Sequence, residues 1–395
     1  MSDRPDQIHL AVALDGAGAH PGAWRADNAR ADELLTARYW ADVVGQAEAG
    51  LLDFITLDDS FLLRNSDVGT IRTDRVAGRL DSTLIAARVA PLTRRIGLIP
   101  TAQVTHTEPF HLAKAIATLD YVSDGRAGIG LSTSLDADEA ALFGRRRASE
   151  LSAEAAADEA AEYANVIRLL WDSWEDDAEI RDISTGRFVD REKLHYTDFV
   201  GEHFSVRGPS ITPRPPQGQP LIAIAVDDDR SAELAGQVAD VGFIAPATSA
   251  EAANRAADLD RFHDAAGRSD EDRVHVFVDL TVVLGDSTSH AIHRKHQLDE
   301  LDGIEYSSAT SLFVGSTDEL ADAIADWHSV GGVSGVRLHP ATHAFDLPRI
   351  AAQVVPELQR RKLFRTAYEE TTLRSHLGLT RPENTFASRQ KVPFA

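Results

Sequence analysis

The sequence contains no cysteine among its 395 residues. This absence excludes disulfides, thiolate metal sites, iron–sulfur clusters and cysteine nucleophiles. Long apolar runs are missing as well, because no stretch approaches the ~18 consecutive apolar residues of a membrane-spanning helix. Residues 1–7 are polar and lack the basic and apolar regions of a secretory signal. We therefore expect a cytoplasmic protein with no membrane partner.

Basic residues are scarce relative to acidic ones. The chain has 40 Lys and Arg against 62 Asp and Glu, which gives a formal net charge of −22 and a pI near 5.0. A chain this acidic repels phosphate backbones and anionic membrane surfaces at long range. The composition therefore argues against nucleic acid as a partner.

Eight short apolar segments alternate with helical segments along the chain. Short strands of this kind are typical of a parallel sheet buried on both faces. Eight such units without a break in composition predict one α/β domain, residues 1–395, folded as a (β/α)8 TIM barrel, with a doubly wound sheet as the alternative. Residues 302–316 are expected to be irregular. The expected strands are 8–14, 54–57, 96–104, 127–134, 221–226, 241–245, 274–284 and 333–338.

Three segments depart from the simple alternation. Residues 149–174 are rich in Ala and Glu and predict a long helix of the outer ring, with Trp171 and Trp174 at least partly packed. Residues 175–219 are charged and then rich in Gly and Pro, which indicates an insertion between the fourth and fifth strands. Residues 374–395 form a polar tail that we expect to wrap the surface.

The active site of such a barrel lies at the C-terminal ends of its strands. No metal site is expected, since His290, His293 and His296 would fan out by about 60° per step on a helix. No G-x-S-x-G elbow or phosphate-binding P-loop motif occurs. The strand-end candidates are polar and mixed, and no single reaction follows from them: Asp15, Asp58, Asp59, Thr101, Gln103, Thr105, His106, Ser132, Thr133, Ser134, Asp227, Asp228 and His339.

Several segments resemble those of a known family. Residues 121–128, YVSDGRAG, are similar to a stretch of the bacterial-luciferase-like flavin monooxygenases. Residues 170–178, LWDSWEDDA, match a signature of the nitrilotriacetate and dibenzothiophene-sulfone monooxygenase branch almost verbatim. The same holds for residues 201–209, GEHFSVRGP, and 216–220, PQGQP. The resemblance runs in order from about residue 8 to residue 364.

The resemblance implies a barrel with insertions that forms a homodimer or homotetramer. It also implies a monooxygenase that takes reduced FMN from a partner flavin reductase and uses O2 to oxidise a small organic substrate. A deazaflavin (F420) oxidoreductase and a non-catalytic flavin-binding homologue are the alternatives. We expect the strand-end loops and the 175–219 insertion to form the substrate pocket.

Some of the family's flavin contacts carry over to this chain. Asp58 ends the second strand, where the family contacts the flavin. Thr101 and Gln103 lie at the end of the third strand, and Thr133 lies at the end of the fourth. The resemblance implies that these four residues bind the cofactor.

Other positions depart from the family pattern. The resemblance implies a His and a Tyr, four residues apart, before the LWDSW segment, but counting back leads to Ala153 and Ala157. After the fifth strand the family has serines that contact the flavin phosphate, whereas this chain has Asp227 and Asp228. Two carboxylates repel a phosphate, so either the phosphate is held differently or the flavin site is altered.

Arginines offer one way to compensate those carboxylates. Arg145, Arg146 and Arg147 follow the fourth strand, and Arg230 follows the aspartates. Guanidinium groups bind phosphate bidentately, so we hypothesise that this cluster neutralises the aspartates and helps to hold an exchangeable FMN. With the family His absent, His106 is the nearest strand-end imidazole, and we expect it to donate or accept the catalytic proton.

Overall fold

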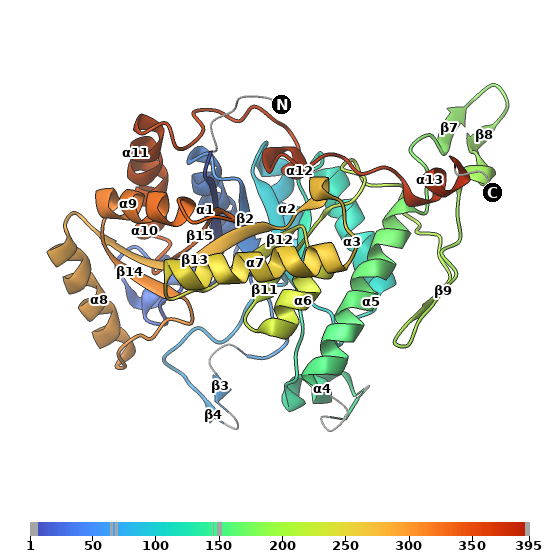
Figure 1. Ribbon diagram of the computed structural model, residues 1–395. Coiled ribbons are helices and arrows are strands. Elements are labelled where there is room, and N and C mark those ends of the chain that lie inside the picture. The colour runs from blue at the N-terminus through green and yellow to red at the C-terminus, as the bar shows by residue number, and fades with distance from the viewer. Residues whose placement is uncertain (1–6, 64–65, 68–69, 145, 148–151, 392–395) are drawn as a thin grey trace.

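Eight parallel strands form a closed barrel in the computed structural model (Figure 1). The structure describes residues 7–63, 66–67, 70–144, 146–147 and 152–391. The barrel strands are β1 (His9–Leu14), β2 (Phe54–Leu57), β5 (Gly97–Gln103), β6 (Gly128–Ser132), β11 (Leu221–Val226), β12 (Val241–Ile244), β13 (His275–Gly285) and β15 (Val333–Pro340). They pair in this order, and β15 pairs with β1 to close the ring. This confirms the predicted TIM barrel and excludes the open doubly wound sheet.

Helices surround the barrel, and side-chain caps mark where several of them begin. Asp81 accepts a hydrogen bond at the start of α2, and Ser152 does so at the start of α5. The longer helices are α1 (Ala37–Ala49), α2 (Ser82–Val89), α3 (Pro109–Val122), α5 (Ala153–Asp172), α6 (Asp229–Val238), α7 (Ser249–Ala265), α8 (Thr288–Asp302) and α9 (Thr317–His328). The shorter segments are α4 (Ala137–Phe143), α10 (Asp346–Arg349), η7 (Ile350–Val354), α11 (Val355–Arg360), α12 (Leu373–His376) and α13 (Thr385–Lys391).

Helix α5 confirms the prediction of a long helix in the outer ring. Trp171 is buried, and its indole Nε1 donates a hydrogen bond to the carbonyl of Ala113 on α3 at 2.9 Å. Trp174 follows the helix, is partly buried and donates from Nε1 to the carbonyl of Ser210 at 2.8 Å. Both indoles thus pack α5 against its neighbours, as the sequence predicts.

The polar tail does more than wrap the surface, which corrects that expectation. Leu377 and Leu379 of the tail, together with Leu373 directly before it, are buried in one apolar cluster with inward-facing barrel residues such as Phe54 and Phe277. These leucines cover the N-terminal end of the barrel interior and exclude water from the phenyl rings there. The tail is therefore part of the core at its start.

The 175–219 insertion forms small hairpins that project from the body of the molecule (Figure 1). It connects the C-terminal end of α5 to the N-terminal end of β11. It therefore begins at the end of the barrel opposite the C-terminal ends of the strands. Its strands are β7 (Glu179–Asp182), β8 (Arg187–Val189), β9 (Phe199–Val200) and β10 (Ser205–Val206), and another small hairpin consists of β3 (Ser66–Asp67) and β4 (Thr70–Ile71).

Part of the segment expected to be irregular is a strand, β14 (Ser311–Ser316). It pairs in parallel with residues 280–285 of β13. β13 is the longest barrel strand at 11 residues, and its C-terminal half offers an edge on which another strand can form hydrogen bonds. Only three apolar residues, between Ser311 and a Gly-Ser pair, mark β14 in the sequence, so the pattern does not reveal this pairing.

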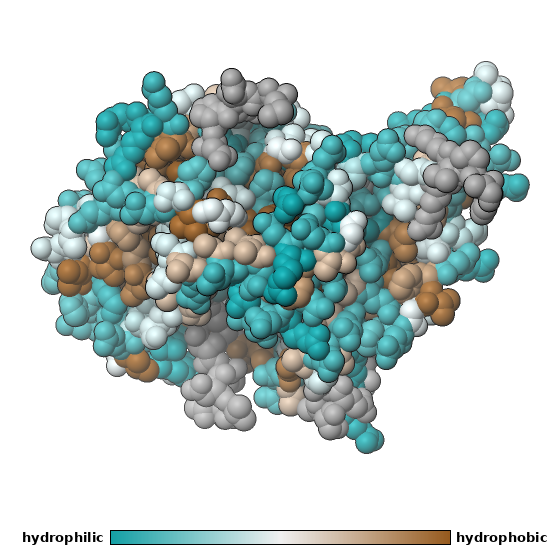
Figure 2. All heavy atoms as spheres, viewed as in Figure 1, coloured by the Kyte–Doolittle hydropathy of each residue, from teal (hydrophilic) through white to brown (hydrophobic). Residues whose placement is uncertain are grey.

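The surface is mostly polar. The face shown in Figure 2 is largely hydrophilic, in keeping with the net charge of −22. Within the described part of the chain, no helix is both long and apolar enough to cross a bilayer.

Candidate functional site

A cavity of about 400 Å³ opens at the C-terminal ends of the barrel strands. Its walls come from the ends of β2, β5, β6 and β11 and from the first turns of α5 and α6. This volume lies in the range of small-molecule sites, which is about 300–1,000 Å³. The cavity is therefore the candidate active site, at the place where a TIM barrel is expected to have one.

Small residues leave room at the centre of this cavity. Gly130 and Ala223 face the barrel interior and contribute no bulky side chain. Thr56 and Thr101 line the same space from β2 and β5 and provide hydroxyl groups. The combination gives an open space with a few polar groups on its wall, as is typical of small-molecule sites.

A charged cluster lies at the floor of the cavity. Arg337 of β15 donates two hydrogen bonds of 2.6 Å to the carboxylate of Asp279 on β13, and its Cζ lies 3.5 Å from the ring centroid of Phe243. His339 Nε2 lies 3.2 Å from an Asp279 oxygen. Burial opposes the charge of Asp279, but Arg337 and His339 outweigh it and lower its pKa to about 2. Asp279 is thus ionised, and its charge is balanced by Arg337.

The wall formed by α5 is apolar. Ala153, Ala156, Ala157 and Ala160 all line the cavity from one face of this helix. Two of them, Ala153 and Ala157, are the positions at which the family resemblance implies a His and a Tyr. The structure thus places both departures in the cavity itself.

The rim beside α6 is acidic. Asp227 and Asp228 line the cavity between β11 and α6. The Asp228 carboxylate accepts hydrogen bonds from the Ser231 backbone N–H and hydroxyl, both at 2.8 Å, and caps the helix. These bonds lower the pKa of Asp228. Burial raises the pKa of Asp227, and the charges of Asp279 and Asp228 raise it further.

Two of the arginines expected to neutralise this rim form ion pairs with glutamates, and the arginine-cluster hypothesis stays a prediction. Arg230 lines the cavity but donates to Glu154 at 3.0 Å and to Glu233 at 3.2 Å. Arg146 forms an ion pair with Glu159. Glutamates on α5 and α6 are within reach of these guanidinium groups, a proximity that only the folded chain creates.

The structure brings together four of the residues predicted to bind the cofactor. Asp58, Thr101, Thr133 and Arg230 all line the cavity. Asp58 is exposed there, and its carboxylate lies 3.3 Å from Nη1 of Arg79. Their assignment as flavin ligands remains a prediction, because no ligand contact is part of this geometry.

The remaining predicted residues lie elsewhere. Gln103 is on the same face of β5 as Thr101, and its Oε1 is buried with no hydrogen-bond partner in the described part of the chain. His106 is buried outside the cavity lining, where its ring stacks on Phe143 at 5.3 Å and 11°. Arg145 lies outside the described residues.

Sequence reasoning missed the floor of the cavity. Thr56, Asp279 and Arg337 lie inside strands rather than at their ends, so selection by strand end passed over them. A signal was present, because Asp279 and Arg337 are single charged residues within apolar strands on inward-facing positions. The insertion, in contrast, supplies no residue to the lining of this cavity, which corrects the expectation that it builds the pocket.

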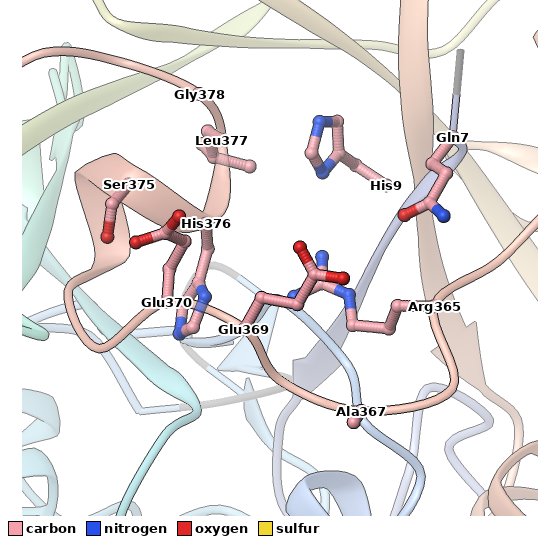
Figure 3. Close-up of a pocket in the computed structure, with 10 residues that line it drawn as sticks. All are labelled: Gln7, His9, Arg365, Ala367, Glu369, Glu370, Ser375, His376, Leu377 and Gly378. Carbon is pink, nitrogen blue, oxygen red and sulfur yellow. The ribbon is translucent and has the colours of Figure 1, made fainter. Parts of the chain in front are cut away.

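A second cavity, of about 230 Å³, lies at the opposite end of the barrel (Figure 3). Its ionisable groups are engaged in structural contacts. Asp53 pairs with Arg365, and His9 Nδ1 lies 3.0 Å from the same carboxylate. His376 Nε2 donates to the carbonyl of Arg95 at 2.8 Å. These contacts join the tail to the barrel, so we assign this cavity to the closure of the barrel rather than to chemistry.

No group of three or more His, Cys, Asp and Glu side chains within the described ranges is placed to hold a metal ion. The cavity at the C-terminal strand ends, called the barrel-mouth cavity below, offers carboxylate, hydroxyl and guanidinium groups.

Comparisons with known proteins agree with this geometry. Residues 17–311 match a family model described as luciferase-like monooxygenase. The N-acetyl-S-(2-succino)cysteine monooxygenase of Bacillus subtilis (strain 168) is 30% identical over 98% of this chain and 100% of its own length. Component A of the nitrilotriacetate monooxygenase of Aminobacter aminovorans is 31% identical over 96% of this chain and 98% of its own length.

Solved structures show the same fold. A long-chain alkane monooxygenase superposes with a TM-score of 0.87 at 23% identity, covering 98% of this chain and 100% of its own. An EDTA monooxygenase from Chelativorans sp. BNC1 gives a TM-score of 0.83 at 21% identity, covering 95% and 99%. At these identities the structural match shows a shared barrel fold.

Proposed function

The chain belongs to the luciferase-like monooxygenase family, and we propose that it is the oxygenase component of a two-component system that uses reduced FMN from a partner flavin reductase. O2 is the oxidant and a small organic molecule is the substrate. The observation that carries the proposal is the family match, which includes six of the eight barrel-strand ends and the α5 and α6 walls of the cavity.

The names of the relatives support this reading over a non-catalytic homologue. They are monooxygenases acting on nitrilotriacetate, dibenzothiophene sulfone and dimethyl sulfide, among others. One of them is named as component A, which implies a second component. These substrates are small and chemically diverse, so the class of substrate carries over to the proposal and the individual compound does not.

The cavity suits one end of FMN better than the other. Its open centre, with the Thr56 and Thr101 hydroxyls and the alanine wall of α5, suits a flat ring. The acidic rim of Asp227 and Asp228 does not suit a phosphate. Reduced flavin supplies the two electrons with which one oxygen atom of O2 is placed on the substrate while the other leaves as water.

The chain's own residues bind and orient within this proposal. Asp58, Thr101 and Thr133 would hydrogen-bond the ring system from the cavity wall, and the buried Oε1 of Gln103, on the same face of β5 as Thr101, would accept a hydrogen bond from a ring N–H. The apolar α5 wall excludes water from the reacting centre. The role of His106 in proton transfer stays a prediction that its variants test.

The experiment has two stages. The first measures binding of reduced FMN to the purified protein without oxygen. The second supplies O2, a flavin reductase and its nicotinamide substrate, and screens organic sulfur and amine compounds for a product heavier by one oxygen atom, with isotopically labelled O2 to show its source. The reductase system without the protein is the control. Absence of flavin binding together with absence of any labelled product would overturn the proposal.

The proposal includes a homodimer or homotetramer, as the family resemblance implies. Light scattering coupled to size-exclusion chromatography measures the mass against the 42.9 kDa of one chain. A mass of one chain at micromolar concentration would contradict this part.

A further inference from the structure

The charged side chains that line the barrel-mouth cavity are mostly acidic. Among the described residues they are Asp58, Asp227 and Asp228 against Arg230 and Arg337. A cavity with this balance disfavours a dianionic group wherever in the cavity that group lies. The inference below therefore depends on the wall as a whole rather than on one contact.

Both arginines of the lining already have carboxylate partners. Arg337 forms two hydrogen bonds of 2.6 Å with Asp279. Arg230 donates to Glu154 at 3.0 Å and to Glu233 at 3.2 Å. A phosphate that paired with either guanidinium group would share it with these carboxylates, whose negative charges would lie close to the phosphate.

The first turn of α6 gives a phosphate no better place. The N-terminus of a helix binds anions through free backbone N–H groups and a positive partial charge. In this chain the carboxylate of Asp228 occupies that position, because it accepts from the Ser231 N–H and hydroxyl at 2.8 Å. The chain's own anion thus takes the place that a bound anion would use.

From these contacts we infer that the cavity selects uncharged riboflavin over its phosphate ester FMN, with Asp227 and Asp228 as the residues that set this specificity. The inference rests on the proposed function, since it takes a reduced flavin as the ligand. Riboflavin and FMN share the ring and the ribityl chain and differ only in the phosphate. Carboxylates accept hydrogen bonds from hydroxyl groups, so the same rim that repels a phosphate can accept from the terminal hydroxyl of riboflavin.

The expected size of the preference follows from the charges. A doubly charged phosphate a few ångströms from two carboxylates loses about tenfold in affinity once solvent screening is included. FMN still binds in this picture, but more weakly than riboflavin.

Anaerobic calorimetric titration of reduced riboflavin and reduced FMN tests the inference. For the wild-type protein we expect riboflavin to bind about tenfold more tightly. In Asp227→Ser/Asp228→Ser, FMN affinity should rise to that of riboflavin while riboflavin affinity changes little. Serine is itself a favoured N-cap residue, so α6 keeps its cap in the double variant.

The matched control is Asp229→Ser, which removes the same charge one residue further along. Asp229 is highly exposed, pairs with Arg255 at 2.9 Å and is not part of the cavity lining. The control should keep the wild-type preference. If the double variant fails to fold, as judged by its melting curve, Asp227→Ser alone carries the test, because Asp227 does not cap the helix.

The outcomes separate the inference from the proposed function. Tighter binding of FMN than of riboflavin by the wild type, or equal binding of both by the wild type and the double variant, overturns the inference and leaves the proposed function in place. Binding of neither flavin overturns the proposed function. If the ratio of riboflavin affinity to FMN affinity decreases in high salt, the preference has an electrostatic origin.

Discussion

At the scale of single residues, Gln103 is a side chain whose buried oxygen lacks a partner inside the protein. A buried acceptor without a hydrogen bond is costly, and a ring N–H of the flavin would satisfy it. We expect Gln103→Ala to weaken binding of reduced flavin by about tenfold, as the loss of one hydrogen bond does. Anaerobic titration measures the change.

Gln46 provides a matched control for this prediction. Its Oε1 is also buried without a hydrogen-bond partner among the described residues, but it lies on α1, whereas Gln103 lies on β5 on the same face as Thr101, which lines the cavity. Gln46→Ala should leave flavin binding unchanged. Equal effects of the two substitutions would show that Gln103 acts through stability and not through a ligand contact.

His106 poses a different question, because its buried ring stacks on Phe143 outside the cavity lining. His106→Phe keeps an aromatic ring for this stack and removes both ring nitrogens. From its placement we expect turnover to be retained across pH 6–8 once a substrate is known. A loss of about 100-fold would instead support the proton-transfer role predicted from the sequence.

The ion pair at the cavity floor makes a third prediction. In Arg337→Gln the buried carboxylate of Asp279 loses its main counter-charge. Breaking such a pair costs about 3 kcal/mol of the free energy of unfolding, which urea denaturation measures. Adding Asp279→Asn should recover much of the loss, because the double variant has no unpaired buried charge. A single variant as stable as the wild type would contradict the prediction.

At the scale of elements, the tail is a structural part of the barrel. Leu373, directly before the tail, is fully buried at the N-terminal end of the barrel interior. Its methyl groups occupy the space that a side chain at Gly97 would fill. We expect Leu373→Ala to lower the free energy of unfolding by about 3 kcal/mol while flavin affinity stays unchanged, since the cavity lies at the other end. Leu84→Ala, at a leucine 69% exposed on α2, is the control without effect.

The start of helix α1 shows how a capping residue, and not apolar spacing alone, sets a helix boundary. Apolar residues at helical spacing begin near residue 32, whereas α1 begins at Ala37, where the Thr36 side chain accepts a hydrogen bond of 3.3 Å from the N–H of Tyr39. Residues 31–33 form a separate short 3₁₀ turn. Helical spacing continued through this turn, so the pattern alone extended the helix too far.

At the scale of the whole molecule, buried carboxylates make stability depend on acid pH. Asp53, Asp240 and Asp279 are buried, and although burial opposes their charge, the nearby basic groups lower each pKa to about 2. The unfolded chain has the ordinary pKa of 3.8, so it binds more protons as pH falls from about 4 towards 2. The stabilisation that these three carboxylates provide is therefore fully present above about pH 4 and is lost as the pH falls below it.

Urea denaturation at a series of pH values checks this dependence. We expect the free energy of unfolding to fall steeply between pH 4 and pH 3. Asp120 has the opposite effect on stability, because burial raises its pKa to about 6. The stabilisation from its protonated form is lost as the pH rises from about 4 to 6. Unchanged stability from pH 5 to pH 3 would contradict the prediction.

The sequence by itself determined the architecture and the family. Short apolar strands buried on both faces and helices with their own spacing are local patterns, so all eight barrel strands were predictable. Asp58, Thr101 and Thr133 were predictable as cavity residues for the same reason, because the end of a parallel strand can be located from the strand alone.

Only the tertiary structure decided which charges meet and at which end of the barrel each long connection lies. Arg337 and Asp279 come from neighbouring strands 58 residues apart in the chain, and Arg230 meets Glu154 across two helices. The 175–219 insertion begins at the end opposite the cavity because the preceding helix returns the chain there. Pairings of this kind depend on distances in space between residues far apart in sequence, and local periodicity does not contain those distances.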